Sequence, residues 1–135
     1  MYAEPYILEI NEHGDHRGLL NSIELPFDIK RVYYIQNASD FSRGNHAHKS
    51  LSQVFICLAG RFVLTLKTPI KTFRYEVLEH HSSIVVPPGY WRDLSDFSSN
   101  SIVLVLVSEH FDESDYIRDY GEYVQWFKDV NNNAS

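Results

Sequence analysis

The sequence predicts an all-β protein, an antiparallel barrel or sandwich that carries one short C-terminal helix. Three observations predict this class. Short runs rich in Val, Ile, Tyr and Phe recur along the chain of 135 residues, and such runs favour strands. Gly, Pro, Asn and Ser separate the runs, as they separate the strands of sandwiches and barrels. Only near the C-terminus does the apolar spacing change to that of a helix.

Each expected strand is a short run of β-branched and aromatic residues. In chain order the runs are residues 6–10, 31–35, 54–58, 62–66, 72–78, 83–86 and 102–107. Ala59-Gly60 lies between two of them and predicts a hairpin turn, because glycine adopts backbone angles that other residues resist. Pro87-Pro88-Gly89 is expected to end a strand sharply.

The C-terminal segment has helical periodicity. Tyr123, Trp126, Phe127 and Val130 fall at i, i+3, i+4 and i+7, which places them on one face of a helix. We expect this apolar stripe to pack on the barrel rather than to bind a ligand. Residues 131–135 are expected to form a frayed tail.

Length and composition indicate one domain spanning residues 1–135. The net charge of −6 argues against a nucleic-acid-binding surface. Cys57 is the single cysteine, so no internal disulfide can form, and its apolar surroundings favour a buried thiol. We expect no signal peptide, and residues 102–107 are far shorter than the ~20 residues of a membrane helix. The sequence therefore predicts a cytoplasmic protein with no membrane partner.

Two histidines one residue apart carry most of the functional information. In a strand, His46 and His48 point to the same face, with about 6.6 Å between their positions at ~3.3 Å per residue. Two imidazoles on one face suit either a metal site or proton transfer.

The segment His46-x-His48-x4-Gln53-x6-Gly60 resembles the first signature of the cupin superfamily, which implies a cupin-like barrel or jelly roll. In that family a glutamate at the position of Gln53, and a histidine at the position of Arg92, complete a metal site with the two histidines. Gln53 is neutral here and Arg92 is a cation that cannot ligate. Because two histidines alone hold a divalent metal poorly, we predict no metal and interpret the pair as acid–base residues.

A closer resemblance covers about residues 5–120. The chain is similar to the sugar 3,4-ketoisomerases, most clearly in residues 31–35, 43–49, 51–54, 96–99 and 112–120. The resemblance implies a metal-independent enzyme without a cofactor, acting on dTDP-4-keto-6-deoxyglucose in deoxy- or amino-sugar biosynthesis for a surface glycan. It also implies a homodimer that can exchange N-terminal strands, with His46 and His48 as the catalytic residues.

The chemistry of that reaction fits the pair. Moving a ketone from C4 to C3 removes the acidic C3 proton, forms an enediol and returns a proton to C4. We hypothesise that His46 is the base at carbon and that His48 shuttles protons at the oxygens, with each group supplying ~10²–10⁴-fold. The two roles can be exchanged, because equal spacing does not rank the rings.

The rest of the substrate requires cations and polar groups. Arg17 lies in Asp15-His16-Arg17-Gly18, which resembles a segment of related sugar epimerases where the arginine serves the diphosphate. Tyr34 is expected on a strand next to the histidine strand, within reach of the sugar. Arginine matches phosphate geometry better than lysine does. The expected substrate-binding residues are Arg17, Tyr34, Arg43, Lys49, Gln53 and Arg92.

Three rival functions remain open at this point. A dTDP-sugar 3,5-epimerase takes the same substrate on the same kind of barrel, but its Arg-Gly-x-His is followed by an aromatic residue rather than by His48. A second rival is a cupin that binds a sugar nucleotide without catalysis, and a third is a metal-dependent oxygenase, which Gln53 and Arg92 disfavour. The configuration at C4 of the product stays undetermined by the sequence.

Overall fold

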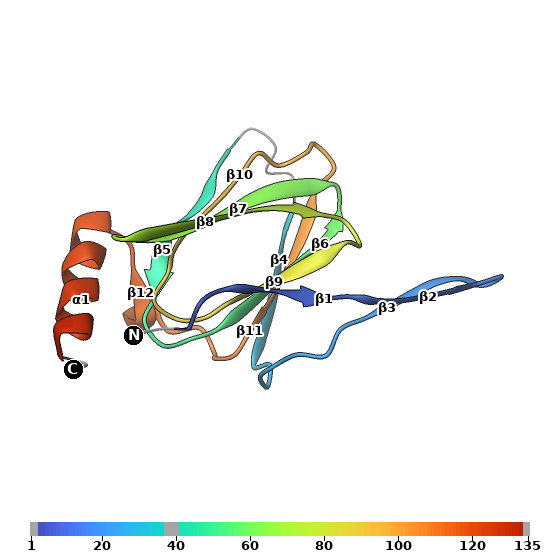
Figure 1. Cartoon of the computed structure of the whole chain (residues 1–135). Coiled ribbons are helices and arrows are strands. Elements are labelled where there is room, and N and C mark those ends of the chain that lie inside the picture. Colours follow the sequence, from blue (N-terminus) through green and yellow to red (C-terminus); the bar gives the residue numbers. More distant parts are fainter. Residues whose placement is uncertain (1–2, 37–40, 134–135) are drawn as a thin grey trace.

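The computed structural model describes residues 3–36 and 41–133, which form two facing β-sheets and one terminal helix (Figure 1). The strands are β1 (Tyr6–Glu9), β2 (Asn11–Asp15), β3 (Gly18–Ser22), β4 (Arg31–Gln36), β5 (Arg43–His48), β6 (Gln53–Ala59), β7 (Arg61–Thr68), β8 (Lys71–Leu78), β9 (Ser82–Val86), β10 (Trp91–Ser95), β11 (Ile102–Val107) and β12 (Tyr116–Ile117). The helices are the 3₁₀ helix η1 (Glu113–Asp115) and α1 (Tyr120–Asn133). The predicted all-β class with a C-terminal helix is confirmed.

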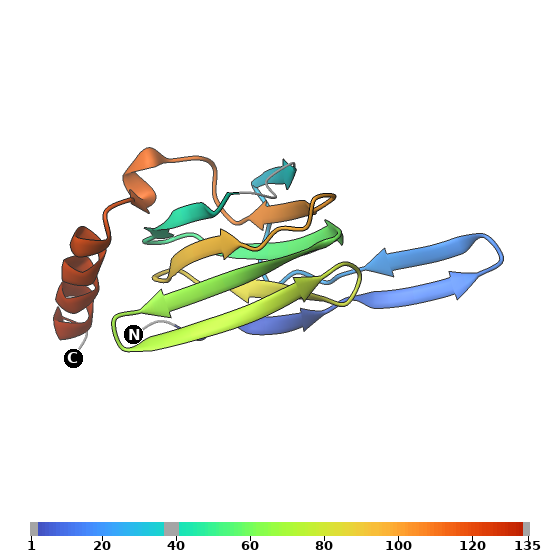
Figure 2. The same cartoon turned by 90° about the horizontal axis from the view of Figure 1, so that it is seen from above.

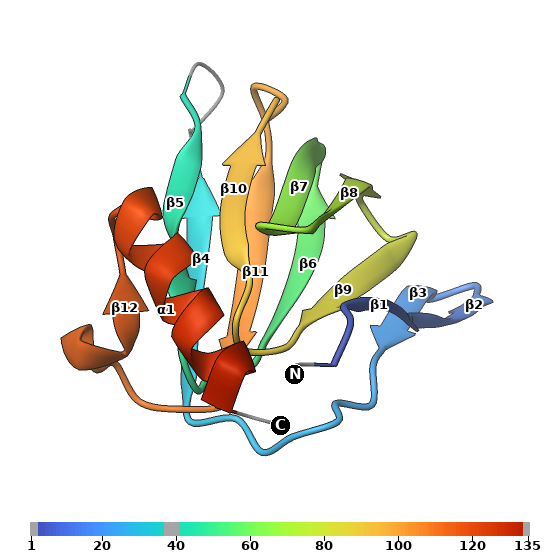
Figure 3. The ribbon, with the colours of Figure 1, turned by 60° about the vertical axis from the view of Figure 1, so that its left-hand side comes forward.

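The two main sheets are antiparallel and enclose the core. One has the order β1-β9-β6-β11-β4, and the other has the order β12-β5-β10-β7-β8 (Figure 3). Phe55 and Val105 from the first sheet meet Leu64 and Leu66 from the second, and none of the four is more than 1% exposed. Cys57 lies in the same core, and burial raises the pKa of its thiol to about 11. It is the buried thiol that its apolar run predicts.

Every strand expected from an apolar run is present, and the structure adds strands that have no such run. β10 contains Arg92 and Asp93, and aspartate is depleted in strands. β12 consists of Tyr116 and Ile117 alone. These strands depend on pairing with β5 and β7 rather than on their own propensity.

The predicted hairpin turn at Gly60 is wrong, because β6 and β7 belong to different sheets. β6 pairs with β9 and β11, whereas β7 pairs with β8 and β10. Gly60 has a φ of +74°, and a Cβ there would lie 2.1 Å from Ser98 Oγ. Glycine is needed for its backbone freedom, as predicted, but at a corner that carries the chain from one sheet to the other.

The predicted placement of Tyr34 beside the histidine strand is also wrong. β4 is an edge strand of one sheet, whereas β5 belongs to the other. Consecutive strands are neighbours in only about two-thirds of cases, and here the chain changes sheets between them. Tyr33 and Ile35 on β4 pack against the core, whereas Tyr34 is 65% exposed.

The helix α1 packs on the barrel as the apolar stripe predicts. Tyr123 is fully buried, and its hydroxyl donates to the carbonyls of Lys67 at 3.1 Å and Gly89 at 2.7 Å. The helix continues to Asn133, so the tail predicted from residue 131 begins too early. Asn131 extends the last turn, because its side chain donates to the carbonyl of Phe127 at 2.7 Å. Among the described residues, no helix is long and apolar enough to cross a membrane.

The hairpin of β2 and β3 projects away from the barrel as a two-stranded arm (Figures 1 and 2). Every residue of both strands is exposed. Leu19 is 65% exposed and Leu20 is 61% exposed, which is unusual for adjacent leucines in a strand. Arg17 lies at the tip, where its guanidinium pairs with Asp15.

Candidate active site

The histidine pair stands on an irregular part of β5. The pairing register with β10 shifts between Arg92 and Asp93, so that Asn45 is an extra residue in the ladder. Gly44 and Asn45 both have positive φ, at 95° and 55°. A Cβ on Gly44 would lie 2.7 Å from the carbonyl oxygen of Arg92, so only glycine fits. Such a bulge re-aims the side chain that follows it, which here is His46.

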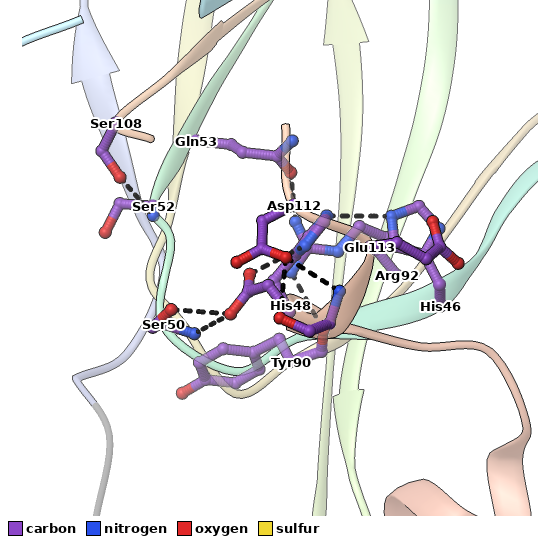
Figure 4. A network of polar contacts seen from close by, with 12 residues as sticks. His46, His48, Ser50, Ser52, Gln53, Tyr90, Arg92, Ser108, Asp112 and Glu113 are labelled. Carbon is purple, nitrogen blue, oxygen red and sulfur yellow. Dashed lines mark hydrogen bonds and ion pairs between the residues drawn. The ribbon is translucent and has the colours of Figure 1, made fainter. Parts of the chain in front are cut away.

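The two imidazoles lie on the same face of β5, as predicted, and they are also in direct contact. His46 Nε2 lies 3.1 Å from His48 Nε2, and the ring centroids are 4.8 Å apart (Figure 4). His46 Nδ1 lies 3.0 Å from the carbonyl oxygen of Gly44. The Tyr116 ring contacts both, with centroid distances of 5.0 Å to His46 and 4.3 Å to His48.

Asp115 closes the other end of this chain of contacts. Its Oδ2 lies 3.2 Å from His48 Nδ1, and its Oδ1 accepts from the backbone N–H of Ser50 at 2.9 Å and from the Ser50 hydroxyl at 2.6 Å. The 3₁₀ turn η1, capped by Asp112, delivers this carboxylate. β12 then pairs Tyr116 with His48, which holds the turn against β5.

Arg92 and Gln53 bind each other beside the histidines. Arg92 faces His46 across the β5–β10 ladder and is 1% exposed. Its guanidinium donates to Gln53 Oε1 and to the Tyr90 carbonyl, the latter at 3.0 Å. Gln53 Nε2 donates in turn to the Tyr33 hydroxyl at 3.1 Å.

These residues do not fit a divalent metal. Two of the four cupin ligand positions form the Arg92–Gln53 pair, which puts a cation where a ligand would stand. The nitrogens of His46 and His48 face each other rather than a common point. Across residues 3–36 and 41–133, no three His, Cys, Asp or Glu side chains form a group that could hold a metal ion.

Burial and nearby cations disfavour charge on each imidazole taken alone. Burial, and after it the Arg92 guanidinium, lower the pKa of His46 to about 4 and that of His48 to about 2. Burial also lowers the pKa of Arg92 itself to about 10. Arg92 therefore remains charged at neutral pH.

A cavity of about 330 Å³ opens beside His46. Its lining residues come from the strands of both sheets and, for Arg118, from the segment just after β12: Arg31, Tyr33, Tyr34, Ile35, Arg43, Gly44, His46, Phe55, Arg92, Leu94, Tyr116 and Arg118. Four of the eight predicted site residues therefore share the cavity, namely Tyr34, Arg43, His46 and Arg92. His48 and Gln53 lie directly behind it in contact with lining residues.

Two predicted residues lie elsewhere in this chain. Arg17 is at the tip of the projecting hairpin, and Lys49 is an exposed residue just after β5. Neither lines the cavity.

The structure adds cavity residues that sequence reasoning did not single out. Arg118 lies 4.2 Å above the Tyr116 ring and pairs with Glu113, and Arg31 lies 4.9 Å from the Tyr33 ring centroid. Residues 31–35 and 112–120 stood out in the sequence as segments of family resemblance. That signal marked the segments, but nothing in it ranked Arg31 or Arg118 above their neighbours.

Known relatives are similar to this chain over nearly its whole length. The family model described as FdtA: WxcM-like, C-terminal matches residues 3–128. A TDP-4-oxo-6-deoxy-alpha-D-glucose-3,4-oxoisomerase of Aneurinibacillus thermoaerophilus is 39% identical, with 95% of this chain and 96% of that protein covered. The chain belongs to the sugar 3,4-ketoisomerase family.

Solved structures of this 3,4-ketoisomerase family have the same fold. A mutant of the 3,4-ketoisomerase QdtA from Thermoanaerobacterium thermosaccharolyticum, in complex with TDP-4-keto-6-deoxyglucose, superposes with a TM-score of 0.89 at 38% identity. The match covers 96% of this chain and 97% of that one. The rmlC epimerase of Mycobacterium tuberculosis has a TM-score of 0.73 at 15% identity. The match covers 86% of this chain and 71% of the epimerase, and it shows a shared fold alone. The epimerase alternative is therefore the more distant one.

Proposed function

We propose that this chain is a 3,4-ketoisomerase that moves the keto group of dTDP-4-keto-6-deoxyglucose from C4 to C3. The observation that carries the proposal is a cavity-lining imidazole, His46, backed by a second imidazole at 3.1 Å. Imidazole is suited to moving protons near neutral pH. A nucleotide-linked sugar as substrate also supports a cytoplasmic location.

The reaction exchanges one proton in each half. In the first half, the C3–H bond breaks, its proton goes to an imidazole nitrogen, and the C4 carbonyl oxygen takes up a proton as the enediol forms. In the second half, the C3 hydroxyl gives up its proton, the C3 carbonyl forms, and C4 takes up a proton on carbon. The protein gains and loses one proton each time, so no redox group is consumed.

The geometry supports a ranking of the two histidines. His46 is partly exposed and lines the cavity, whereas His48 is 1% exposed and lies behind it. We therefore assign the substrate-contacting role to His46 and the relay role to His48. Tyr116 lines the same cavity beside both rings and can hydrogen-bond a sugar oxygen.

The arginines of the cavity supply the positive charge for a diphosphate. Arg31, Arg43 and Arg118 line it together with Arg92. Arginine forks bind phosphate oxygens in pairs. We assign the diphosphate to Arg31, Arg43 and Arg118, because Arg92 is 1% exposed and is held by Gln53 and the Tyr90 carbonyl, whereas the partner of Arg118 is an exposed carboxylate, Glu113.

The projecting hairpin supports a homodimer in which this arm lies on a second copy of the chain. An isolated two-stranded hairpin is only marginally stable in water, and here both strands are exposed. The outer face of β4 is also uncovered, with Val32 at 54% and Tyr34 at 65% exposure. Arg17, at the tip of the arm, would then serve the partner's site rather than its own.

The direct test is incubation with dTDP-4-keto-6-deoxyglucose in deuterated water. A 3,4-ketoisomerase gives a 3-keto product that carries deuterium at C4. Deuterium at C3 or C5 with the ketone still at C4 would indicate an epimerase instead. Unlabelled, unchanged substrate would indicate a protein that binds the sugar nucleotide without catalysis.

A further inference from the structure

The contacts of the two histidines fix where their protons must be. The carbonyl oxygen of Gly44 can only accept, so His46 Nδ1, at 3.0 Å, carries the hydrogen of that contact. The Asp115 carboxylate likewise accepts, so His48 Nδ1, at 3.2 Å, carries a hydrogen as well. Each neutral ring has only one N–H, and both are thereby used at the outer ends.

The inner contact then lacks a hydrogen. With both Nδ1 atoms protonated, two neutral rings would direct lone pairs at each other from Nε2 atoms 3.1 Å apart. That separation is normal for a hydrogen bond and repulsive for two lone pairs. One more proton between His46 and His48 makes all three contacts of the chain hydrogen bonds.

We infer that Asp115 makes the couple hold one proton beyond those of two neutral rings, shared between His46 Nε2 and His48 Nε2. Asp115 is thus a positioning residue that acts through His48. Its carboxylate is 8% exposed, and the two donors of Ser50 orient it. A buried ion pair with several hydrogen bonds is the arrangement in which a buried charge is tolerated.

The surroundings oppose this proton, which is why Asp115 matters. Besides burial, the groups that lower the pKa of His48 are Arg92 on β10, His46, Arg118 after β12 and Arg31 on β4. The Tyr116 ring, on β12, also lies against His48. Glu113 on η1 raises the pKa of His46 from a distance, but Asp115 is the carboxylate in direct contact with the couple, so it offsets these cations at the shortest range.

A stored proton suits the isomerisation, and this role rests on the proposed function. Each half of the reaction takes one proton from the sugar and returns one to it. A couple that already holds a proton can give it to the C4 oxygen while it accepts the proton from C3. Its proton count is then unchanged in the enediol complex, and the second half repeats the exchange in the same sense.

Asp115→Asn separates the two protonation patterns with little change in shape. The amide oxygen would keep the Ser50 donors, so the amide NH₂ would face His48 Nδ1 and donate to it. His48 would then switch its hydrogen to Nε2 and donate to His46. All contacts would be filled with two ring protons instead of three, so the variant should hold one proton fewer.

Nitrogen-15 NMR of the histidine rings tests this at neutral pH without substrate. In the wild type we expect both Nδ1 atoms to be protonated, and one far-downfield proton to couple to both Nε2 atoms. In Asp115→Asn we expect His48 to be protonated at Nε2 alone. A wild-type His48 that is neutral and protonated at Nε2 would overturn the inference, and this measurement stands even where the variant does not fold.

Kinetics test the positioning role separately. Asp115→Asn should lower kcat by ~10²–10⁴-fold, as expected when a catalytic imidazole takes the wrong tautomer, with little change in KM. Asp129→Asn is the matched control: it removes an exposed carboxylate on α1 that accepts from Gln125 Nε2 and lies outside the site, and it should retain wild-type kcat. Wild-type kcat in Asp115→Asn would refute the positioning role. An inactive wild type would refute the proposed function and leave the NMR result to decide the shared proton.

Discussion

Arg92 places a buried cation at a position where cupins have a metal-binding histidine. It stands fully buried next to the histidine pair, and its guanidinium is held by Gln53 and the Tyr90 carbonyl. Its Nε has no hydrogen-bond partner among residues 3–36 and 41–133. A charge buried with an unfilled donor is costly, so the position is one where function rather than stability explains the residue.

The role of His46 yields the first prediction at this scale. In His46→Asn, the side chain stays polar but can no longer take up a proton, so turnover should fall by at least the ~10²–10⁴-fold typical of a positioned acid–base group. TDP should still bind with wild-type affinity, because the arginines that line the cavity remain. Steady-state kinetics and calorimetric titration with TDP measure the two quantities.

His81→Asn is a suitable control for that experiment. His81 is exposed in the turn between β8 and β9 and lies outside the cavity, so the variant should behave as the wild type. Substantial residual turnover in His46→Asn would contradict the role assigned to His46 and would indicate His48 or Tyr116 as the base.

At the scale of elements, the bulge in β5 decides how the histidines meet. A regular strand would place residues 46 and 48 side by side with no requirement for their rings to touch. The extra residue at Asn45 turns His46 toward His48. The close approach of Gly44 to the Arg92 carbonyl fixes the bulge against β10.

Gly44→Ala is therefore predicted to damage both stability and activity. Its Cβ would lie 2.7 Å from the Arg92 carbonyl oxygen at a φ of +95°, and such backbone strain costs about 1–3 kcal/mol. Urea denaturation should show this loss of unfolding free energy, and kcat should fall because the shifted bulge separates His46 from His48.

Gly18→Ala distinguishes the two causes of the lost stability in Gly44→Ala, namely backbone strain at positive φ and the clash with the Arg92 carbonyl. Gly18 has a φ of +118° but nothing lies within 4 Å of its missing Cβ. The substitution therefore adds backbone strain without a clash. Equal losses of unfolding free energy in the two variants would contradict the importance of the Gly44–Arg92 contact.

The same elements show what sequence reasoning could reach. The spacing of His46 and His48 placed both rings on one face, because strand periodicity is local. Asp115 was out of reach, since a separation of 67 residues lies between it and His48, and only the pairing of β12 with β5 joins them. The bulge at Asn45 also depends on its partner strand, β10, so no local sequence pattern could predict it.

At the scale of the whole molecule, local patterns predicted the strands but not their partners. The run before Gly60 and the run after it were both recognised, yet the two strands lie in different sheets. Sheet membership depends on where each inward face finds its core, which is a property of the complete barrel. For the same reason, β4 and β5 face each other across the cavity instead of pairing.

The exposed arm gives the prediction that concerns the assembly. Leu19→Glu with Leu20→Glu should make the protein monomeric in sedimentation equilibrium at micromolar concentration. Burying a leucine is worth ~1.5–3 kcal/mol, and two-fold symmetry counts each substitution twice. Ile70→Glu is the matched control, because Ile70 is 85% exposed in the turn between β7 and β8, outside the arm, and this variant should stay dimeric. A monomeric wild type, or a dimer that survives the double substitution, would rule out exchange of this arm.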